Sequence, residues 1–150
     1  MPQSLSQVYL HSVWSTKNRV PMIYPSVEQQ LYAYMGGIIK KLGGIPIQIN
    51  GMPEHIHVLS TLPRVVSIAK YLEEIKSSSS KWIKTQDAKI KNFSWQRGYA
   101  TFSVSSSVVP IVNQYIIDQK EHHKKQTYEE EVIQFLKEYD VEYDENYLWD

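Results

Sequence analysis

The chain of 150 residues contains no cysteine. Disulfide bonds, thiolate metal sites and cysteine nucleophiles are therefore excluded, which fits a reducing compartment. No stretch of 18 apolar residues is present, and the first residues lack the pattern of a secretory signal. We therefore expect a cytoplasmic protein that does not enter a membrane. Its length predicts a single domain over residues 1–150.

The formal net charge of zero conceals an asymmetry along the chain. Residues 1–127 hold 15 Lys and Arg against 7 Asp and Glu, a balance of +8, whereas residues 128–150 hold 1 basic and 9 acidic residues, a balance of −8. A basic body suits a polyanion such as nucleic acid, although an ordinary solvated surface explains the same excess. The acidic C-terminal stretch would repel DNA near a site. It can instead pack away from DNA, contact a partner subunit or shield the basic face.

Hydrophobic patterning predicts the element order β-α-β-β-α-β, followed by two further helices. The predicted strands cover residues 7–14, 45–50, 55–61 and 98–105, and the predicted helices cover 26–42, 65–85, 107–123 and 127–139. This order is the ferredoxin-like plan of the α+β class, an antiparallel sheet with helices on one face. Because that fold hosts many activities, function has to be argued from a site.

The most informative motif is His55-Ile56-His57, in the third predicted strand. Alternate residues of a strand point to the same face, so the two imidazoles emerge side by side while Ile56 faces a core. Two neutral imidazoles on a rigid strand supply half of a divalent-metal site. The alternative is that one histidine lies on the surface and the other is a satisfied core residue.

Tyr115 lies on the helix predicted after the fourth strand and has polar neighbours on its own helix face. Gln119 and His122 follow it by four and seven residues, where a core tyrosine usually has apolar companions. Gln119 offers a carbonyl oxygen as a third metal ligand. Tyr115 offers a phenol that needs metal or local charge to become a good nucleophile. Two histidines and an oxygen donor suit Mn²⁺, Mg²⁺ or Zn²⁺, so the sequence does not decide which of these metals is bound.

Taken together, the motifs resemble the insertion-sequence-200-like transposases, the single-tyrosine members of the HUH (His-hydrophobe-His) nucleases. The order and spacing of several segments carry this resemblance through nearly the whole chain. These segments are Trp14–Arg19, Asn50–His57, Lys76–Trp82, Phe93–Tyr99, Phe102–Val104 and Tyr115–His123.

The resemblance implies a prokaryotic, metal-dependent transposase that is associated with the nucleoid when it binds DNA. It would act as a homodimer on single-stranded DNA hairpins at the ends of a mobile element. His55, His57 and Gln119 would bind Mg²⁺ or Mn²⁺, and Tyr115 would attack a phosphate to give a 5′-phosphotyrosine and a free 3′-OH. The tyrosine helix of one subunit can complete the His pair of the other in this family. Rejoining the strand would need no ATP.

The remaining family-like residues are predicted to meet DNA or the metal. Basic side chains beside the strands are expected to contact phosphates: Lys17, Arg19 and Arg97. Two aromatic side chains either stack on unpaired bases or pack in the core: Trp95 and Tyr99. Two histidines at the end of the tyrosine helix are candidate accessory contacts to metal or phosphate, with plain surface positions as the alternative: His122 and His123.

Two other functions use parts of the same pattern. A non-catalytic protein derived from a transposase would bind single-stranded nucleic acid through the basic and aromatic residues and would need neither Tyr115 nor Gln119. A metal-dependent phosphodiesterase would use water as its nucleophile and leave Tyr115 without a chemical role. The simultaneous presence of both histidines, the glutamine and the tyrosine favours the transposase.

Overall fold

In the computed structural model, which describes residues 2–150, four antiparallel strands form one sheet in the order β2-β3-β1-β4. The strands are β1 (Tyr9–Ser15), β2 (Pro46–Met52), β3 (His55–Thr61) and β4 (Ala100–Val104). β3 and β1 are central, and each is hydrogen-bonded on both sides. The predicted α+β class and ferredoxin-like strand order are confirmed.

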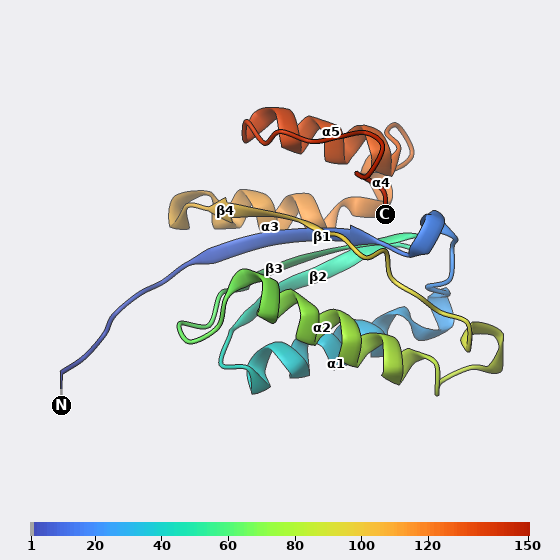
Figure 1. The fold of residues 1–150 in the computed structure, drawn as a ribbon, viewed down its shortest axis with the longest axis horizontal. Helices are drawn as coiled ribbons and strands as arrows, with labels where there is room; N and C mark the ends of the chain where they lie inside the picture. The colour runs from blue at the N-terminus through green and yellow to red at the C-terminus, as the bar shows by residue number, and fades with distance from the viewer. Residues whose placement is uncertain (1) are drawn as a thin grey trace.

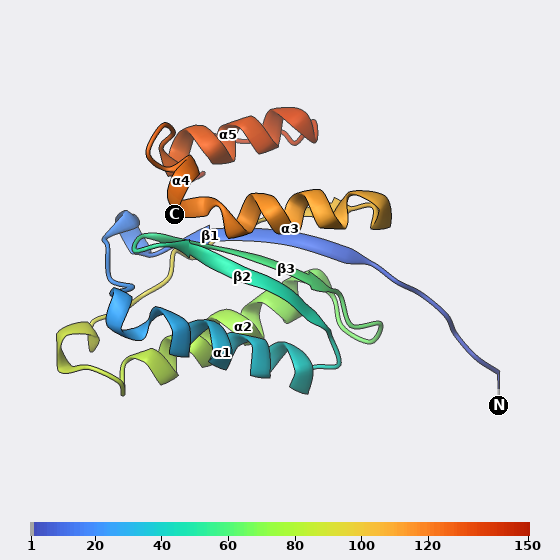
Figure 2. The ribbon, with the colours of Figure 1, turned by 180° about the vertical axis from the view of Figure 1, so that it is seen from behind.

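Helices cover both faces of this sheet (Figures 1 and 2). Two long helices, α1 (Pro25–Lys41) and α2 (Ile68–Ile83), lie on one face. The opposite face carries α3 (Val109–Ile117), the short α4 (Gln119–His122) and α5 (Tyr128–Glu138). Three 3-10 turns join these elements: η1 (Lys17–Arg19), η2 (Ala88–Ile90) and η3 (Ser106–Val108). Within residues 2–150, none of the helices combines the length and apolarity that crossing a lipid bilayer requires.

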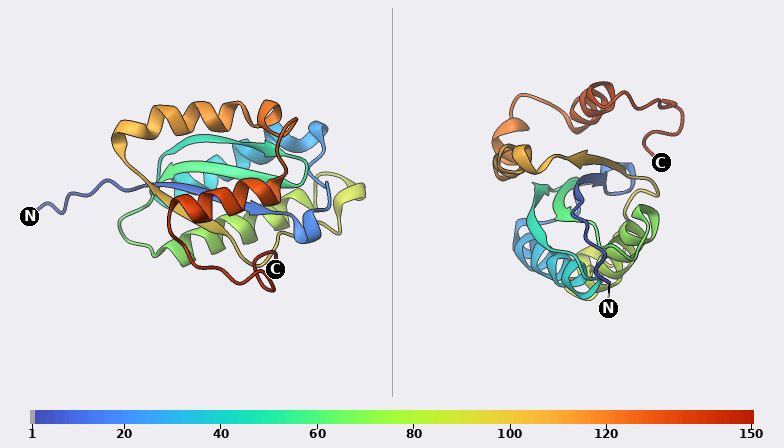
Figure 3. Two further views of the ribbon diagram at one scale, coloured as in Figure 1. Left: turned by 90° about the horizontal axis from the view of Figure 1, so that it is seen from above. Right: turned by 90° about the vertical axis from the view of Figure 1, so that its left-hand side faces the viewer.

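The period-two alternation of the strands divides the core between the two faces. Leu10, Trp14, Ile56 and Val58 are buried with apolar residues of α1 and α2. Val13 and Phe102 belong instead to a cluster with three apolar residues of α5. The α5 helix is therefore held to the sheet by an apolar cluster of its own, and the sheet separates this cluster from the one formed with α1 and α2 (Figure 3).

Local capping signals fix the ends of the helices. The Ser67 side chain accepts a hydrogen bond from the Lys70 backbone N–H at the start of α2, and Thr127 and Glu130 form a capping box at the start of α5. The prediction of one unbroken helix over 107–123 is wrong, because Asp118 departs from helical geometry with φ −88° and ψ 15°. Aspartate is a weak helix former, and the Asp118 carboxylate accepts hydrogen bonds from Gln114.

The acidic C-terminal stretch is docked on the body of the protein. Tyr143, Leu148 and Trp149 pack against the apolar cluster beneath α5. The carbonyl oxygen of Asp150 accepts the Gly98 backbone N–H at 2.8 Å. The stretch therefore packs against the chain's own body, and through Glu129 and Trp149 it covers part of the basic face at Arg19.

The hairpin that presents the His55 strand depends on the absence of a side chain at Gly51. A Cβ at this position would lie 2.2 Å from the His55 carbonyl oxygen, a backbone atom. We expect Gly51→Ala to lower the free energy of unfolding by about 2 kcal/mol or more, because the backbone has to move. The measurement is urea denaturation followed by circular dichroism.

The matched control is Gly37→Ala, at an exposed position of α1 where an added Cβ meets nothing within 4 Å. It should stabilise the protein by about 0.5–1 kcal/mol, the usual gain from replacing a helical glycine. Equal stability of Gly51→Ala and the wild type would contradict the close approach of the hairpin strands.

Candidate functional site

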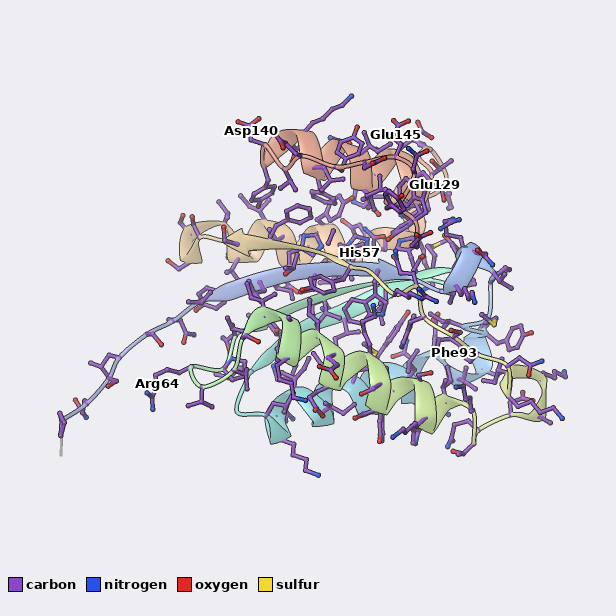
Figure 4. The ribbon with its side chains drawn as sticks, viewed as in Figure 1. His57, Arg64, Phe93, Glu129, Asp140 and Glu145 are labelled. Carbon is purple, nitrogen blue, oxygen red and sulfur yellow. The ribbon has the colours of Figure 1, made fainter. Side chains whose placement is uncertain are left out.

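His55 and His57 lie fully buried on the face of β3 that α4 and α5 cover. Ile56, between them, points into the α1–α2 core, as the alternation predicts. The strand is positioned by its register with β1, in which Ser15 pairs with His55 and Val13 pairs with His57. In Figure 4, His57 lies in the layer between the sheet and the C-terminal helices. The two imidazoles therefore face a covered interior.

Gln119 approaches this histidine pair from α4, which covers the same face of the sheet. The break at Asp118 ends α3 and starts α4 with Gln119, whose side chain is fully buried. Its Oε1 lies 3.1 Å from His55 Nε2 and 3.1 Å from His123 Nε2. The structure thus brings together the two histidines and the glutamine that the sequence singled out.

Glu131 of α5 occupies the centre of the cluster, a position that sequence reasoning missed. Its Oε1 lies 2.9 Å from His57 Nε2, 3.2 Å from His123 Nε2 and 3.6 Å from His55 Nε2. The carboxylate is only 1% exposed. The available signal was its spacing, because Glu131 follows the buried Tyr128 by three residues and therefore lies on the apolar face of α5.

Tyr115 reaches the same carboxylate from α3. Its hydroxyl donates a hydrogen bond to Glu131 Oε2, which also accepts Gln119 Nε2 at 3.1 Å. The Tyr115 ring stacks on His122, with centroids 4.4 Å apart, and lies 6.0 Å from the His57 ring centroid. All of these groups belong to one chain, so the tyrosine faces the histidine pair of its own subunit.

The site is electrostatically polarised around Glu131. Burial opposes its charged form, but the interactions with His57 and His123, including a hydrogen bond from each, outweigh burial and lower the pKa of Glu131. Burial lowers the pKa of His57 and keeps the ring neutral, as a metal ligand must be. Burial, together with the Glu131 charge, raises the pKa of Tyr115. The phenol is therefore fully protonated in this state.

The donor set fits a divalent cation. Ligand atoms of His55, His57, His123 and Glu131 all lie within 4.8 Å of one another, and the Gln119 carbonyl oxygen contacts two of the histidines. A carboxylate buried among neutral imidazoles is an environment in which a cation would balance the negative charge. Imidazole nitrogens with oxygen donors are suitable ligands for Mn²⁺ and Zn²⁺, and less so for Mg²⁺.

Histidines 122 and 123 differ in their surroundings. His123 faces Glu131 and Gln119 through Nε2, and its pKa is raised because the hydrogen bond and charge of Glu131 outweigh the effect of burial. His122 instead packs on Tyr115, and its buried Nε2 has no hydrogen-bond partner among the described residues. His123 therefore belongs to the ligand cluster and His122 to the environment of the phenol.

The basic residues predicted to bind phosphates lie near the C-terminal segment. The Arg19 guanidinium contacts the Glu129 carboxylate at 3.4 Å and the Trp149 carbonyl oxygen at 3.2 Å. Lys17 and Arg97, both exposed, line one cavity of about 320 Å³ together with Trp149 and Asp150. Lys17 and Arg97 therefore share one exposed cavity, whereas the Arg19 side chain is paired with groups of the protein itself.

The two predicted base-stacking aromatics have different environments. Trp95 is 7% exposed, packs edge-on against Trp14 and Phe93, and donates its indole N–H to Ser79. Its placement matches the core-packing alternative. Tyr99 is 39% exposed and lies beside Lys76, whose Nζ is 5.8 Å from the ring centroid. Of these two rings, Tyr99 is the one accessible to a base.

Comparisons with known proteins agree with the fold and the motifs. A structure from Deinococcus radiodurans R1, described as a candidate transposase, has a TM-score of 0.64 at 20% identity, covering 79% of this chain and 98% of that chain. A REP-associated tyrosine transposase bound to a REP hairpin has a TM-score of 0.61 at 17% identity, covering 82% of this chain and 72% of that chain. No curated protein matched. The family described as "Transposase IS200 like" matches residues 4–119, and the chain belongs to this family.

Proposed function

We propose that the protein is a metal-dependent, single-strand DNA endonuclease and strand transferase that uses Tyr115 as its nucleophile. The observation that carries this proposal is the contact of Tyr115 with Glu131, the carboxylate that also faces His55, His57 and His123. A phenol, a ligand cluster and a buried carboxylate converge on one point. Membership of the transposase family supports the same reading.

The proposed reaction follows from these positions. The Tyr115 oxygen attacks a DNA phosphorus, the P–O3′ bond breaks, and the products are a 5′-phosphotyrosine and a free 3′-OH. Glu131 Oε2 accepts the hydrogen bond of the Tyr115 hydroxyl and so orients the phenol, whose proton leaves to water as the new P–O bond forms, while the departing O3′ takes up a proton from water. The covalent link preserves the phosphodiester bond, so that a 3′-OH can displace Tyr115 and rejoin the strand without ATP.

We propose that the cofactor is Mg²⁺ or Mn²⁺, held by His55, His57 and Gln119, with His123 and Glu131 as additional donors. The nitrogen-rich donor set favours Mn²⁺. These residues would hold the cation, which when bound would supply the positive charge needed to polarise a phosphoryl oxygen. The chain's own residues would orient the phosphate and exclude bulk water, since all the donors except His123 are fully buried.

The proposed DNA substrate is single-stranded and carries a hairpin at the element end. Lys17 and Arg97 project from one cavity and are suited to phosphates, while the exposed ring of Tyr99 is suited to an unpaired base. The REP-associated relative is described as bound to a hairpin, which supports this substrate class. The docked C-terminal segment lines the Lys17–Arg97 cavity and would meet DNA there.

A homodimer remains part of the proposal, and we propose that each active site is built within one chain. Tyr115 and Gln119 already contact the Glu131–His cluster of their own subunit. A dimer would then bring two complete sites to two DNA ends. The non-catalytic binding protein is the alternative function; it would leave the convergence of Tyr115 on this cluster without a purpose.

Tyr115→Phe should abolish the covalent protein–DNA adduct, because the phenylalanine ring has no attacking oxygen. The assay is incubation with single-stranded DNA from the element's ends and Mn²⁺, followed by a denaturing gel, with DNA binding measured separately. Tyr147→Phe, at a residue 70% exposed, is the matched control and should retain adduct formation. Cleavage without any adduct in the wild type would indicate hydrolysis by water, and wild-type binding without cleavage would indicate the non-catalytic protein.

Mixing Tyr115→Phe with His57→Ala subunits tests the proposed location of the site within one chain. We expect no recovery of adduct formation, since each mutant subunit lacks one essential group of its own site. The measurement is the adduct yield of the mixture after joint refolding, relative to each variant alone. Substantial recovery would show instead that the tyrosine helix of one subunit completes the histidine pair of its partner.

Metal binding should stabilise the fold through Glu131. With Mn²⁺ at about 100 times its Kd, the free energy of unfolding should rise by about 2.7 kcal/mol. Glu131→Ala should lose most of this gain at the same Mn²⁺ concentration, whereas Glu138→Gln, at an exposed position of α5, should keep it. Denaturation with and without Mn²⁺ provides the measurement, and an undiminished gain in Glu131→Ala would remove Glu131 from the ligand set.

Phosphate contacts should appear in the salt dependence of DNA binding. Lys17→Ala and Arg97→Ala should each reduce the slope of log K against log salt by roughly 0.7, the value for one phosphate contact on a single strand. Fluorescence anisotropy at several salt concentrations measures this slope. Arg64→Ala, on the loop before α2 at the end of the molecule away from Glu129 (Figure 4), should leave it unchanged. A full slope in both variants would place the DNA elsewhere.

A further inference from the structure

A third buried histidine, His11 of β1, contacts one of the two metal-site histidines of β3, His57. His11 is 3% exposed, and its Nε2 lies 2.7 Å from His57 Nδ1. The ring planes are inclined by only 29°, and their centroids are 5.0 Å apart, which is compatible with an in-plane contact between the two nitrogens. The sheet register produces this contact, because Val13 pairs with His57 and His11, two residues before Val13, lies on the same face of β1. His11 therefore has a fixed relation to His57 that does not depend on any helix.

The two ring nitrogens of His57 face different partners. Nε2 points to Glu131 in the ligand cluster, while Nδ1 points to His11. An imidazole that binds a cation through Nε2 carries its hydrogen on Nδ1, and that N–H needs an acceptor. The Nε2 lone pair of His11 is at hydrogen-bond distance to provide it.

His55 has an outer partner of another kind. Its Nδ1 lies 3.0 Å from Glu54 Oε1, and the Glu54 side chain is 26% exposed. A carboxylate is tolerated there because water reaches it. At the position of His11 a carboxylate would be a second buried anion close to Glu131, which is unfavourable. A neutral imidazole offers an acceptor without adding charge.

We propose that His11 is a positioning residue of the metal centre, which holds His57 through Nδ1 so that Nε2 faces the cation. This inference rests on the proposed metal-dependent function and adds a residue to it. Packing alone would not require a histidine at this position. The Phe135 ring lies edge-on to the His11 ring, with centroids 5.2 Å apart, and an apolar side chain would fill the same space. Burying a polar ring is costly unless its hydrogen bonds are used.

The hydrogen bond itself can be tested in the metal-free wild-type protein. With ¹⁵N-labelled histidine, we expect a scalar coupling across the hydrogen bond between His11 Nε2 and His57 Nδ1. This measurement requires neither DNA nor a variant, and core packing without a hydrogen bond would not produce the coupling. Its absence under conditions where both nitrogens are assigned would overturn the proposal.

The consequence for metal binding is tested by calorimetric titration with Mn²⁺. His11→Phe keeps a ring but removes the acceptor, and should weaken Mn²⁺ binding roughly 10- to 100-fold. His11→Gln places an amide near the same point and should recover most of the affinity. The control Ser12→Ala removes a hydrogen bond to Thr101 from the neighbouring residue of β1 and should bind Mn²⁺ like the wild type.

Thermal melts of each variant without metal separate affinity from folding. If His11→Phe does not fold, His11→Leu replaces it in the same comparison with His11→Gln. Equal Mn²⁺ affinity in the wild type and a folded His11→Phe would overturn the positioning role alone. A wild type that binds no Mn²⁺ would overturn the proposed metal centre, and this role with it. Failure of strand transfer with normal Mn²⁺ binding would affect only the proposed reaction.

Discussion

The buried carboxylate of Glu131 is the interaction on which the site depends. It contacts His57 and His123 through one oxygen and Tyr115 and Gln119 through the other. A carboxylate removed from water is unfavourable by several kcal/mol unless it is paired and hydrogen-bonded. Here its partners come from β3, α3, α4 and the segment that follows α4. One side chain therefore ties the C-terminal helices to the central strand and sets the distance between phenol and ligand cluster.

Several local features bring that carboxylate to its place. The glycine at position 51 allows the tight hairpin that starts β3 at His55. The break at Asp118 turns Gln119 into the layer, and the Thr127–Glu130 capping box starts α5 so that Glu131 follows within its first turn. Each feature is weak alone, but together they define a covered site on the face of the sheet opposite α1 and α2. His11 adds support from β1, on the outer side of His57.

The charge asymmetry acquires a structural meaning from the docked C-terminal stretch. Arg19 forms an ion pair with Glu129 and donates a hydrogen bond to the Trp149 carbonyl oxygen, and the final two residues line the cavity that holds Lys17 and Arg97. Of the acidic residues in this stretch, Glu131 is buried in the site, while Glu129 and Asp150 lie beside Arg19, Lys17 and Arg97. The buried carboxylate favours the proposed cation, whereas the acidic groups beside the basic loop compete with the proposed DNA for the same basic side chains.

Local patterns in the sequence determined the order of the helices and strands and the shared face of His55 and His57, because periodicity and turn residues act over a few neighbours. They could not determine the role of Glu131, since an acidic run at a helix start is also an ordinary charged surface. Nor did they separate Trp95, which is buried, from Tyr99, which is exposed. The contact of His11 with His57 spans 46 residues of sequence. Only the register of the sheet and the packing of α5 against it decided these, because they depend on long-range contacts that no local pattern encodes.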